Sequence, residues 1–474
     1  MSTVEAVTRA AAGAVEGLAA MGRAGRARLL RAAADEIEAR REALIETAAR
    51  ETHLGETRLN GEVTRTAYQL RVFADVLDEG SYLEATIDHA GNTPMGPGPD
   101  LRRLLLPLGP VAVFGASNFP LAFSVPGGDT ASALAAGCPV VLKAHESHPD
   151  TSALAFEALQ AAVATAGAPE GTVGLISGRE AGAELVTDPR ITAVGFTGSL
   201  SGGQALRALI EARPEPIPFY GELASLNPLV VTPAAAAART ESIADGLVGA
   251  VTGSLGQLCT KPGLAFVPAD AAGDALVARM ATALADVPAG LLLNDRVAEG
   301  FDAIGADLRS QPGVSVKATG TTGEGATPAL LTVDATNFTA HLAEECFGPL
   351  ALVVRYTSEA ELLDVLATLP GSLTGTVHSE STDDLAPLLA VLQPRAGRLL
   401  FDAYPTGVLV SWAQTHGGPW PSTNTVHTSV GPTAIRRFLR PVTWQNAPER
   451  ALPEELRDDF KGIPRRVDGV LHVG

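Results

Sequence analysis

The segment VAVFGASNFPLAFSVPGGDTASALAAGCPVVLK, residues 111–143, decides the fold class. Its two β-branched, apolar runs, residues 111–114 and 140–142, flank a stretch in which apolar residues have helical spacing, residues 124–136. A strand, a helix and a second strand in this order predict a βαβ crossover, which places the two strands parallel in one sheet.

Strands and helices continue to alternate beyond this segment. We expect further strands over residues 173–176, 194–196 and 229–231, and helices over residues 151–165, 181–185 and 203–212. This order predicts an α/β fold in which helices cover both faces of a parallel sheet. Ligands of such sheets bind at the carboxyl ends of the strands, so we expect the site at the turns 115–118, 143–146 and 197–203.

The remaining segments have other patterns. Apolar residues recur at helical spacing over residues 24–50 and 62–77, and Gly and Pro cluster over residues 91–100. We interpret the cluster as a loop or as the tip of an extended arm. A second α/β block is expected from about residue 245 to residue 430, and the basic, aromatic residues 436–444 have the pattern of a strand.

The composition excludes several classes of protein. A net charge of −18 disfavours a nucleic-acid partner, because phosphate contacts need clustered Lys and Arg. The chain lacks the roughly 18 uninterrupted apolar residues of a membrane helix, and its start lacks the apolar block of a signal peptide. We therefore expect a cytoplasmic protein without a membrane partner.

The cysteines, Cys138, Cys259 and Cys346, are too few and scattered for a disulfide framework or a zinc site, and we expect no metal.

Cys259 is the candidate nucleophile. It lies in the run Gly256-Gln257-Leu258-Cys259, in which the glycine predicts a tight turn that presents the thiol close to a ligand. The alternative is a small buried side chain, which is the usual role of a free cysteine.

Glu222 and Asn118 are candidates for a general base and an oxyanion donor. Glu222 is the one charged residue in the segment 219–228, and we expect burial to raise its pKa, which suits a base. Asn118 follows a predicted strand at the ligand edge, where its amide can donate to a developing oxyanion. The structural alternatives are a carboxylate that pairs with an amide or an Arg, and a turn Asn before Pro120.

Two further turns have the pattern of a phosphate or ribose site. The Thr197-Gly198-Ser199 turn, with Gly203 beyond it, can place a pyrophosphate at a helix N-terminus, although it lacks the GxGxxG pattern. Lys143 ends a predicted strand, where it either contacts a ribose or phosphate or lies in solvent.

Six segments, taken in order, resemble the aldehyde dehydrogenase superfamily. They are the Asn118 turn, the Lys143 strand, the Phe-Thr-Gly-Ser turn, the Glu222 strand, the Gly-Gln-x-Cys turn and the box Glu344-Glu345-Cys346-Phe347-Gly348-Pro349. Each segment is weakly specific by itself, but six matches in this order over about 230 residues are highly specific.

Within the superfamily the chain is similar to the α-ketoglutaric semialdehyde (2,5-dioxovalerate) dehydrogenases. The segments that carry this resemblance are residues 117–125, 127–130, 416–419, 428–431 and 434–442. The match covers nearly the whole chain. Relative to the family, the chain starts at the first helices, without the usual N-terminal strands.

The resemblance implies a domain organisation and the catalytic roles. It implies a Rossmann-type dinucleotide-binding domain (residues 1–84 and 108–228), an α/β catalytic domain (229–432), and a β oligomerisation arm with a C-terminal tail (85–107 and 433–474). Cys259 would form a thioester, and Glu222 would activate the water that hydrolyses it. Asn118 and the Cys259 amide would form the oxyanion hole.

The resemblance also implies a nicotinamide cofactor. The residues implied to hold it are Lys143, Gly198, Ser199, Gly203, Glu345 and Phe347. We expect Glu146 to accept hydrogen bonds from the adenosine ribose and to repel a 2′-phosphate. We therefore predict NAD over NADP, with use of both as the alternative.

For the substrate, the resemblance implies a short aldehyde with a distant carboxylate, 2,5-dioxovalerate being the first choice. Arg65 is the candidate that binds this carboxylate, because Arg can make two parallel hydrogen bonds to it; the alternative is a surface Arg. Phe119, Phe123 and Trp420 are the candidates for apolar walls.

The chain departs from the family at a few positions. After Glu222 the usual Leu-Gly-Gly-Lys becomes Leu-Ala-Ser-Leu, Cys346 replaces an aliphatic residue, and Ser201 and Gln204 stand where this branch often has Arg. Three alternative functions are an NADP-dependent fatty or other semialdehyde dehydrogenase, a coenzyme-A-acylating enzyme, and a catalytically silent member of the fold. The last two would not need an intact Glu222.

Exposed strand edges predict association of subunits. We expect a homodimer or homotetramer that forms through the arm around residues 87–106 and the strand near residues 440–444, because unpaired edges invite pairing.

Overall fold

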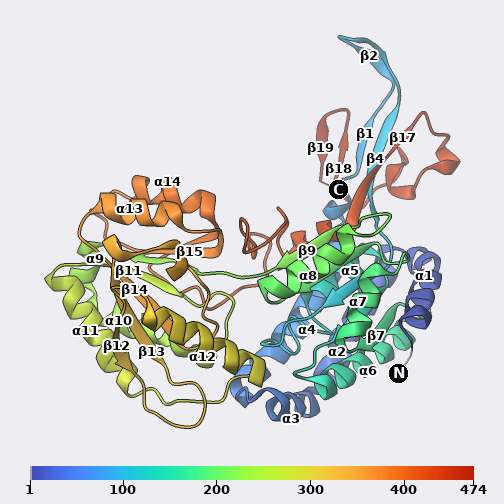
Figure 1. Ribbon diagram of the computed structural model, residues 1–474. Coiled ribbons are helices and arrows are strands. Elements are labelled where there is room, and N and C mark those ends of the chain that lie inside the picture. Colours follow the sequence, from blue (N-terminus) through green and yellow to red (C-terminus); the bar gives the residue numbers. More distant parts are fainter. Residues whose placement is uncertain (1–2, 474) are drawn as a thin grey trace.

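The computed structural model describes residues 3–473, which form two α/β halves and a protruding β arm (Figure 1). The first half begins with helices α1 (Val4–Ala20), α2 (Gly22–Ala39), α3 (Arg41–Thr52) and α4 (Glu56–Glu79). The helix expected over residues 24–50 is divided into two, because Arg40 leaves helical backbone geometry with φ −101° and ψ 14°.

The sheet of the first half is parallel, with strand order β7-β6-β5-β8-β9. Its strands are β5 (Val111–Phe114), β6 (Val140–Ala144), β7 (Val173–Ser177), β8 (Ala193–Thr197) and β9 (Phe219–Glu222). The helices between them are α5 (Gly128–Ala136), α6 (Pro149–Ala166), α7 (Arg179–Thr187) and α8 (Leu200–Glu211). The chain builds outward from β5 in both directions, so the carboxyl ends of β5 and β8 border a topological switch point, where such sheets bind ligands.

Helix α5 begins four residues later than the expected helix. Residues 124–127 form a turn instead, in which the Gly127 amide donates to the Ser124 carbonyl at 2.9 Å. The strand expected over residues 229–231 forms, but it belongs to the sheet of the second half rather than to the first alternation, so that sheet begins before residue 245.

The sheet of the second half has the order β12-β13-β14-β11-β10-β15-β16 and is parallel except for β12. Its strands are β10 (Leu229–Val231), β11 (Leu264–Pro268), β12 (Ser315–Thr319), β13 (Ala329–Asp334), β14 (Leu350–Tyr356), β15 (Ser372–His378) and β16 (Ala396–Phe401). Its helices are α9 (Pro233–Ala238), α10 (Thr240–Thr252), α11 (Ala271–Ala285), α12 (Asp295–Ser310), α13 (Glu359–Thr368) and α14 (Ala386–Leu392). Two apolar clusters, one with α9–α11 and one with α12–α14, cover its two faces.

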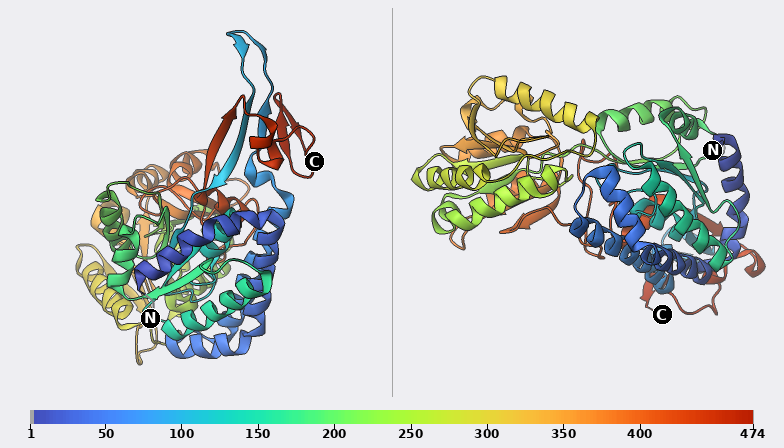
Figure 2. Two further views of the ribbon diagram at one scale, coloured as in Figure 1. Left: turned by 90° about the vertical axis from the view of Figure 1, so that its right-hand side faces the viewer. Right: turned by 90° about the horizontal axis from the view of Figure 1, so that it is seen from below.

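The arm is a five-stranded sheet with the order β17-β4-β1-β18-β19, and it projects from the first half (Figures 1 and 2). Its strands are β1 (Thr86–Asp88), β4 (Leu101–Pro107), β17 (Leu439–Gln445), β18 (Arg465–Val467) and β19 (Val470–His472). The Gly- and Pro-rich residues form a hairpin at its tip, β2 (Gly91–Thr93) and β3 (Gly96–Gly98).

The strand expected over residues 436–444 begins only at Leu439, because the preceding residues form the 3₁₀ helix η6 (Pro432–Phe438). Arg437 in this helix is 2% exposed, and its guanidinium donates to Asp129 Oδ1 at 2.7 Å, which ties the segment to α5. The other short helices are η1 (Ser81–Leu83), η2 (Gly253–Gly256), η3 (Ala335–Asn337), η4 (Ala340–Leu342), η5 (Gln393–Arg395), η7 (Glu449–Ala451) and η8 (Glu454–Leu456). None of the helices in residues 3–473 is long and apolar enough to cross a bilayer.

Candidate active site

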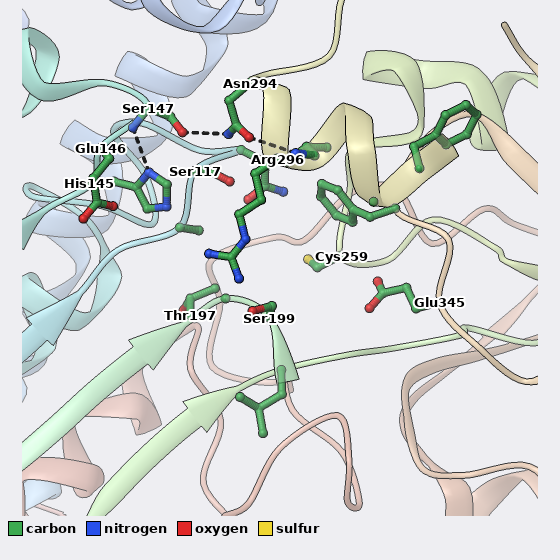
Figure 3. Close-up of a pocket in the computed structure, with 18 of the residues that line it drawn as sticks. Ser117, His145, Glu146, Ser147, Thr197, Ser199, Cys259, Asn294, Arg296 and Glu345 are labelled. Atoms are coloured by element: carbon green, nitrogen blue, oxygen red, sulfur yellow. Dashed lines mark hydrogen bonds between the residues drawn. The ribbon is translucent and has the colours of Figure 1, made fainter. Parts of the chain in front are cut away.

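A cavity of about 650 Å³ lies between the two halves (Figure 3). The turns after β5, β6 and β8 line it from one side, and the first turns of α12 line it from the other. This position agrees with the carboxyl ends of the strands expected from the sequence. The residues predicted from the sequence that line the cavity are Asn118, Glu146, Gly198, Ser199, Glu222, Cys259, Glu345 and Phe347.

Cys259 follows a strained turn. Ser254 and Leu255 have φ of 52° and 52°, a left-handed conformation that costs non-glycine residues on the order of 1–3 kcal/mol each. Gly256 continues the turn with φ 66°, and a Cβ at this position would overlap the carbonyl group of Gly348. The glycine of the Gly-Gln-x-Cys segment is therefore needed for the close approach of two backbones.

Asn227 fixes the loop on the other side of Cys259. Its Nδ2 donates to the carbonyl oxygens of Cys259, at 2.8 Å, and of Lys261, at 3.0 Å. Its Oδ1 accepts from the Ser225 hydroxyl at 2.7 Å. Ser225 belongs to the segment in which this chain departs from the family, and the structure gives it a role that the sequence analysis did not predict.

The Cys259 thiol lies against a histidine and a carboxylate. Its Sγ is 3.6 Å from Nε2 of His416, and the same nitrogen is 2.9 Å from Oε1 of Glu222. The Ser429 hydroxyl donates to the other carboxylate oxygen, Glu222 Oε2, at 2.7 Å. His416 and Glu222 are 1% and 3% exposed. The carboxylate is therefore held by two partners in a dry environment, with the thiol beside it.

Neither His416 nor Ser429 was singled out as a functional residue from the sequence. The available signal was their position in two of the segments that resemble the semialdehyde branch, residues 416–419 and 428–431. The ligand-type atoms of Cys259, Glu222 and His416 lie within 4.8 Å of one another, close enough to hold a metal ion.

The electrostatics of this cluster correct one expectation. Burial raises the pKa of Glu222, as expected, but the charge of His416 and the hydrogen bonds from His416 and Ser429 outweigh burial, so the net shift is downward. Glu222 is therefore ionised. Burial and the nearby Glu222 carboxylate raise the pKa of Cys259 well above its usual value, so the resting nucleophile is a neutral thiol.

Asn118 lies on the turn after β5, 7% exposed, and faces the cysteine turn. Its Nδ2 donates to the carbonyl oxygen of Gln257 at 3.0 Å. Its own carbonyl oxygen accepts from the guanidinium of Arg58. The amide thus contacts the residue two positions before Cys259, and Asn118 and Cys259 line the same cavity.

Phe119, Phe123 and Arg65 lie together, and Arg58 joins them. The two rings meet edge to face at 5.2 Å, and the Phe123 ring is 5.9 Å from the His416 ring. The guanidinium of Arg58 lies 4.6 Å from the centre of the Phe119 ring, and that of Arg65 lies 5.1 Å from the centre of the Phe123 ring.

Trp420 is not part of this wall. Its side chain is 45% exposed, and its ring lies 5.5 Å from the guanidinium carbon of Arg207 on α8. The expectation that Trp420 faces the substrate together with the two phenylalanines is therefore not met, because Trp420 packs on the outer surface of the first half.

The remaining predicted residues surround the cavity without all lining it. Lys143, the penultimate residue of β6, forms an ion pair with Glu146, so it fixes the side chain that lines the cavity. Gly203 lies in the first turn of α8, where a Cβ would overlap Leu223 after β9. The Ser199 hydroxyl caps α8 by accepting from the Gly202 amide at 3.2 Å. The α8 N-terminus suits the phosphates of a dinucleotide, and the Glu146 carboxylate can accept hydrogen bonds from ribose hydroxyls.

Comparisons with known proteins identify the family. The aldehyde dehydrogenase family model matches residues 1–440. The chain belongs to the aldehyde dehydrogenase family. It is 49% identical to alpha-ketoglutaric semialdehyde dehydrogenase 2 of Azospirillum brasilense over 459 residues, which is 94% of this chain and 87% of that protein. It is 43% identical to alpha-ketoglutaric semialdehyde dehydrogenase of Acinetobacter baylyi over 440 residues, 90% of this chain and 84% of that protein.

Solved structures show the same fold for this aldehyde dehydrogenase. A putative aldehyde dehydrogenase from Burkholderia cenocepacia has a TM-score of 0.79 at 23% identity, with coverage of 94% of this chain and 92% of that chain. A 1-pyrroline-5-carboxylate dehydrogenase has a TM-score of 0.79 at 24% identity, with coverage of 93% and 85%. The protein is an oxidoreductase that oxidises an aldehyde, and NAD or NADP accepts the electrons, as in the family.

Proposed function

We propose that this aldehyde dehydrogenase oxidises 2,5-dioxovalerate to 2-oxoglutarate in the cleft between a cofactor-binding half and a catalytic half. The names of the two semialdehyde dehydrogenases that it resembles at 49% and 43% identity support the substrate. The structural observation that carries the proposal is a pair of guanidinium groups from α4, Arg58 and Arg65, which lie over the two phenylalanine rings and interact electrostatically with Cys259.

These guanidinium groups have buried N–H groups without a partner among the described residues: Nη1 of Arg58, and Nε and Nη2 of Arg65. A buried donor without an acceptor costs free energy, so such groups call for a ligand. Burial lowers the pKa of both side chains, and the charge of Glu62 opposes this effect. A substrate carboxylate would accept hydrogen bonds from these donors, and its negative charge would compensate the positive charge of the buried guanidinium groups.

Acylation needs a base for the neutral thiol. The Cys259 proton passes to the Glu222 carboxylate, which His416 and Ser429 hold beside the sulfur. The thiolate attacks the aldehyde carbon, and the oxyanion that forms is stabilised by the Asn118 amide and the Cys259 backbone N–H. The residues proposed below to lie around a bound NAD or NADP would place it as the hydride acceptor for this adduct, which would leave a thioester on Cys259.

Hydrolysis then uses the same carboxylate. Glu222 first releases the proton of the thiol to solvent and is ionised again. It then takes a proton from a water molecule as the water oxygen attacks the thioester carbon, and it passes that proton to the Cys259 sulfur as the carbon–sulfur bond breaks and the acid leaves. The lowered pKa of Glu222 keeps it ionised for this step. A coenzyme-A-acylating enzyme would release the thioester to a thiol and would have no hydrolysis step for this carboxylate to serve.

We propose that NAD is preferred over NADP and that Lys143, Glu146, Ser199, Glu345 and Phe347 lie around the bound dinucleotide. Glu146 supports this, because it lines the cavity at the end of β6 and its charge opposes a 2′-phosphate. Arg179 lines the same cavity at the start of α7, and its positive charge is the feature that favours NADP.

We further propose that subunits associate through the arm. Strands β17 and β19 are the two edges of its sheet, and Val470 and Leu471 on β19 are 59% and 56% exposed. Unpaired edges with apolar side chains favour pairing with another subunit. Light scattering at micromolar concentration should give a dimer or a tetramer, and a monomeric mass would contradict the proposal.

The substrate proposal is tested by comparing aldehydes with and without a carboxylate. Arg65→Gln and Arg58→Gln should each lower kcat/KM for 2,5-dioxovalerate by roughly 30- to 150-fold, equivalent to about 2–3 kcal/mol for a charge-assisted contact. Pentanal, which has the same length and no carboxylate, should lose much less. Arg71→Gln is the matched control, because Arg71 lies on α4 and pairs with Glu38 on α2, away from the site.

The outcomes separate the alternatives. Equal losses for both aldehydes would assign the arginines a structural role. If the wild-type enzyme has a higher kcat/KM for long-chain aldehydes than for 2,5-dioxovalerate, the fatty-aldehyde alternative holds instead.

A further inference from the structure

Arg296 reaches into the cavity from the half of the protein opposite the cofactor turns. It belongs to the first turn of α12, and its side chain extends toward the turn that carries Thr197 and Ser199, with Ser117 nearby (Figure 3). Among residues 3–473 its guanidinium makes no hydrogen bond or ion pair. No motif in the sequence marks this residue.

The helix itself does not explain a cation at this position. The N-terminus of a helix carries a partial positive charge, so an Arg in the first turn is unfavourable. The needs of the N-terminus are already met, because Asn294 caps α12 by accepting from the Val297 amide at 2.9 Å and Asp295 supplies an acidic residue. Because Arg296 is exposed rather than buried, its guanidinium is accessible to a ligand that enters the cavity.

A hydrogen bond across the cleft fixes where α12 begins. The Asn294 side-chain amide donates to the Ser147 hydroxyl at 2.7 Å, and Ser147 lies between β6 and α6 in the first half (Figure 3). This contact ties the first turn of α12 to the carboxyl edge of the parallel sheet. Arg296 is thereby held over the same edge, facing the residues 197–199.

The chemistry of the surrounding groups selects the partner. The N-terminus of α8, capped by Ser199, presents backbone N–H groups and a positive dipole end to the cavity. Ser117 and Thr197 add short hydroxyl side chains. Arg offers a planar group with several donors, which suits a phosphate. A diphosphate that lies between α8 and α12 would be bound from both sides.

We propose that Arg296 binds the pyrophosphate of the nicotinamide dinucleotide from the catalytic half of the enzyme. It faces the α8 N-terminus and completes a clamp around the two phosphates. Because the clamp joins the two halves, cofactor binding also holds the cleft closed. The proposal does not depend on which aldehyde is the substrate, and it holds for NAD and NADP alike, since both contain the pyrophosphate.

The test measures binding without turnover. Isothermal titration calorimetry of the full-length protein with NADH, and separately with ADP-ribose, should give dissociation constants that rise about tenfold or more in Arg296→Gln for both ligands. ADP-ribose keeps the pyrophosphate and lacks the nicotinamide. Arg296→Lys, which keeps the charge and loses the two-point contact, should give intermediate values. Affinity of the wild type should also fall more steeply with salt than affinity of Arg296→Gln.

Arg309→Gln is the matched control, because Arg309 ends the same helix outside the cavity and its removal takes away the same charge. Its dissociation constants should equal those of the wild type. Unchanged affinity for ADP-ribose in Arg296→Gln would overturn the proposal, and so would a loss confined to NADH, which would place the contact at the nicotinamide. An equal loss of affinity in Arg309→Gln would show that the effect comes from the overall charge of the protein, and this result would also overturn the proposal. If Arg296→Gln does not fold, the same criteria apply to Arg296→Lys.

Discussion

The imidazole Nε2 of His416 lies 2.9 Å from Oε1 of Glu222, although the two residues are 194 positions apart in the chain. Ser429 occupies the second carboxylate oxygen. A buried carboxylate with both oxygens hydrogen-bonded has one orientation and stays ionised, whereas a carboxylate in an apolar pocket tends to take up a proton. His416 therefore decides the charge state of the residue that must accept protons in both half-reactions.

Replacing His416 should move the pH dependence of turnover. His416→Asn removes the charge and the nitrogen donor that lower the Glu222 pKa, while burial, which raises it, remains. The Glu222 pKa should therefore rise, and the acidic limb of the kcat–pH profile should move to higher pH, with kcat at neutral pH lower by roughly 10- to 100-fold. Steady-state rates between pH 5 and 9, where buffers allow, measure this shift.

His341→Asn is the control for this experiment, because His341 is an exposed partner of Asp307 and lies outside the cavity. A lower kcat in His416→Asn with an unmoved acidic limb would mean that His416 acts on Cys259 or on packing rather than through Glu222.

Glu222→Gln should separate acylation from hydrolysis. The amide keeps the shape of the side chain but cannot take a proton from water, so hydrolysis slows more than acylation. Acylation continues because loss of the Glu222 charge lowers the Cys259 pKa and lets the thiol ionise without this base. The thioester accumulates, and a stoichiometric burst of reduced cofactor with poor turnover is expected. Rapid mixing with detection of the nicotinamide absorbance measures the burst. Wild-type turnover in this variant would place the base elsewhere.

The same variant should change the reactivity of the thiol in the opposite direction. The Glu222 charge is, after burial, the largest cause that raises the Cys259 pKa. Removing the charge lowers this pKa, so the thiolate fraction at neutral pH increases, and iodoacetamide should alkylate Cys259 faster in Glu222→Gln than in the wild type. Mass spectrometry assigns the modified residue. Cys138 and Cys346 are buried and should stay unmodified, and slower alkylation of Cys259 would show that Glu222 acts as its base even in the resting enzyme.

Local patterns in the sequence were sufficient for the fold and for part of the site. The β-branched runs predicted strands β5 to β8 of the first sheet and strand β10 of the second, and the carboxyl-edge rule predicted the turns that bring Asn118, Glu146 and Ser199 to one cavity. The first residues of helices and strands were less predictable, because hydrogen bonds that the apolar spacing does not reveal determine where these elements begin. Helix α5 starts late since Ser124 closes a turn, and β17 starts late since Arg437 is held by Asp129.

Local sequence patterns could not predict the direction of the Glu222 pKa shift or the residues that contact Cys259. His416 is 157 residues from Cys259, and no spacing along the chain relates the two. The sequence showed that Glu222 would be buried, which predicts a raised pKa, but the sign of the net shift depends on His416 and Ser429, which only the fold brings near. The position of Trp420 was also beyond local patterns. The sequence could not show that its ring lies over the surface residue Arg207 rather than beside the phenylalanines.

The cluster of Cys259, His416 and Glu222 should bind thiophilic divalent cations. Thiolate, imidazole and carboxylate are the ligands that Zn²⁺ prefers, and their atoms lie within 4.8 Å of one another. We expect Zn²⁺ and Cd²⁺ to inhibit the enzyme, with recovery on addition of a chelator, and Cd²⁺ to give an ultraviolet thiolate-to-metal band. Both effects should weaken in His416→Asn and persist in His341→Asn. A cadmium band that survives Cys259→Ala would assign binding to another site.

Cofactor choice should depend on two opposite charges at the edge of the cavity. Glu146, at the end of β6, repels a 2′-phosphate, while Arg179, at the start of α7 after the neighbouring strand β7, attracts it. Lys143 pairs with Glu146 and weakens the repulsion without removing it, so the preference for NAD should amount to a few kcal/mol at most.

Glu146→Thr should narrow the ratio of kcat/KM for NAD to that for NADP, or reverse it, because it removes the repulsion and leaves Arg179 in place. Arg179→Gln should widen the ratio, because it lowers kcat/KM for NADP and leaves that for NAD nearly unchanged. Steady-state kinetics with each cofactor at saturating aldehyde measure both ratios. A wild-type enzyme that favours NADP would show that Arg179, rather than Glu146, faces the ribose, and an unchanged ratio in both variants would place the adenosine ribose away from this edge.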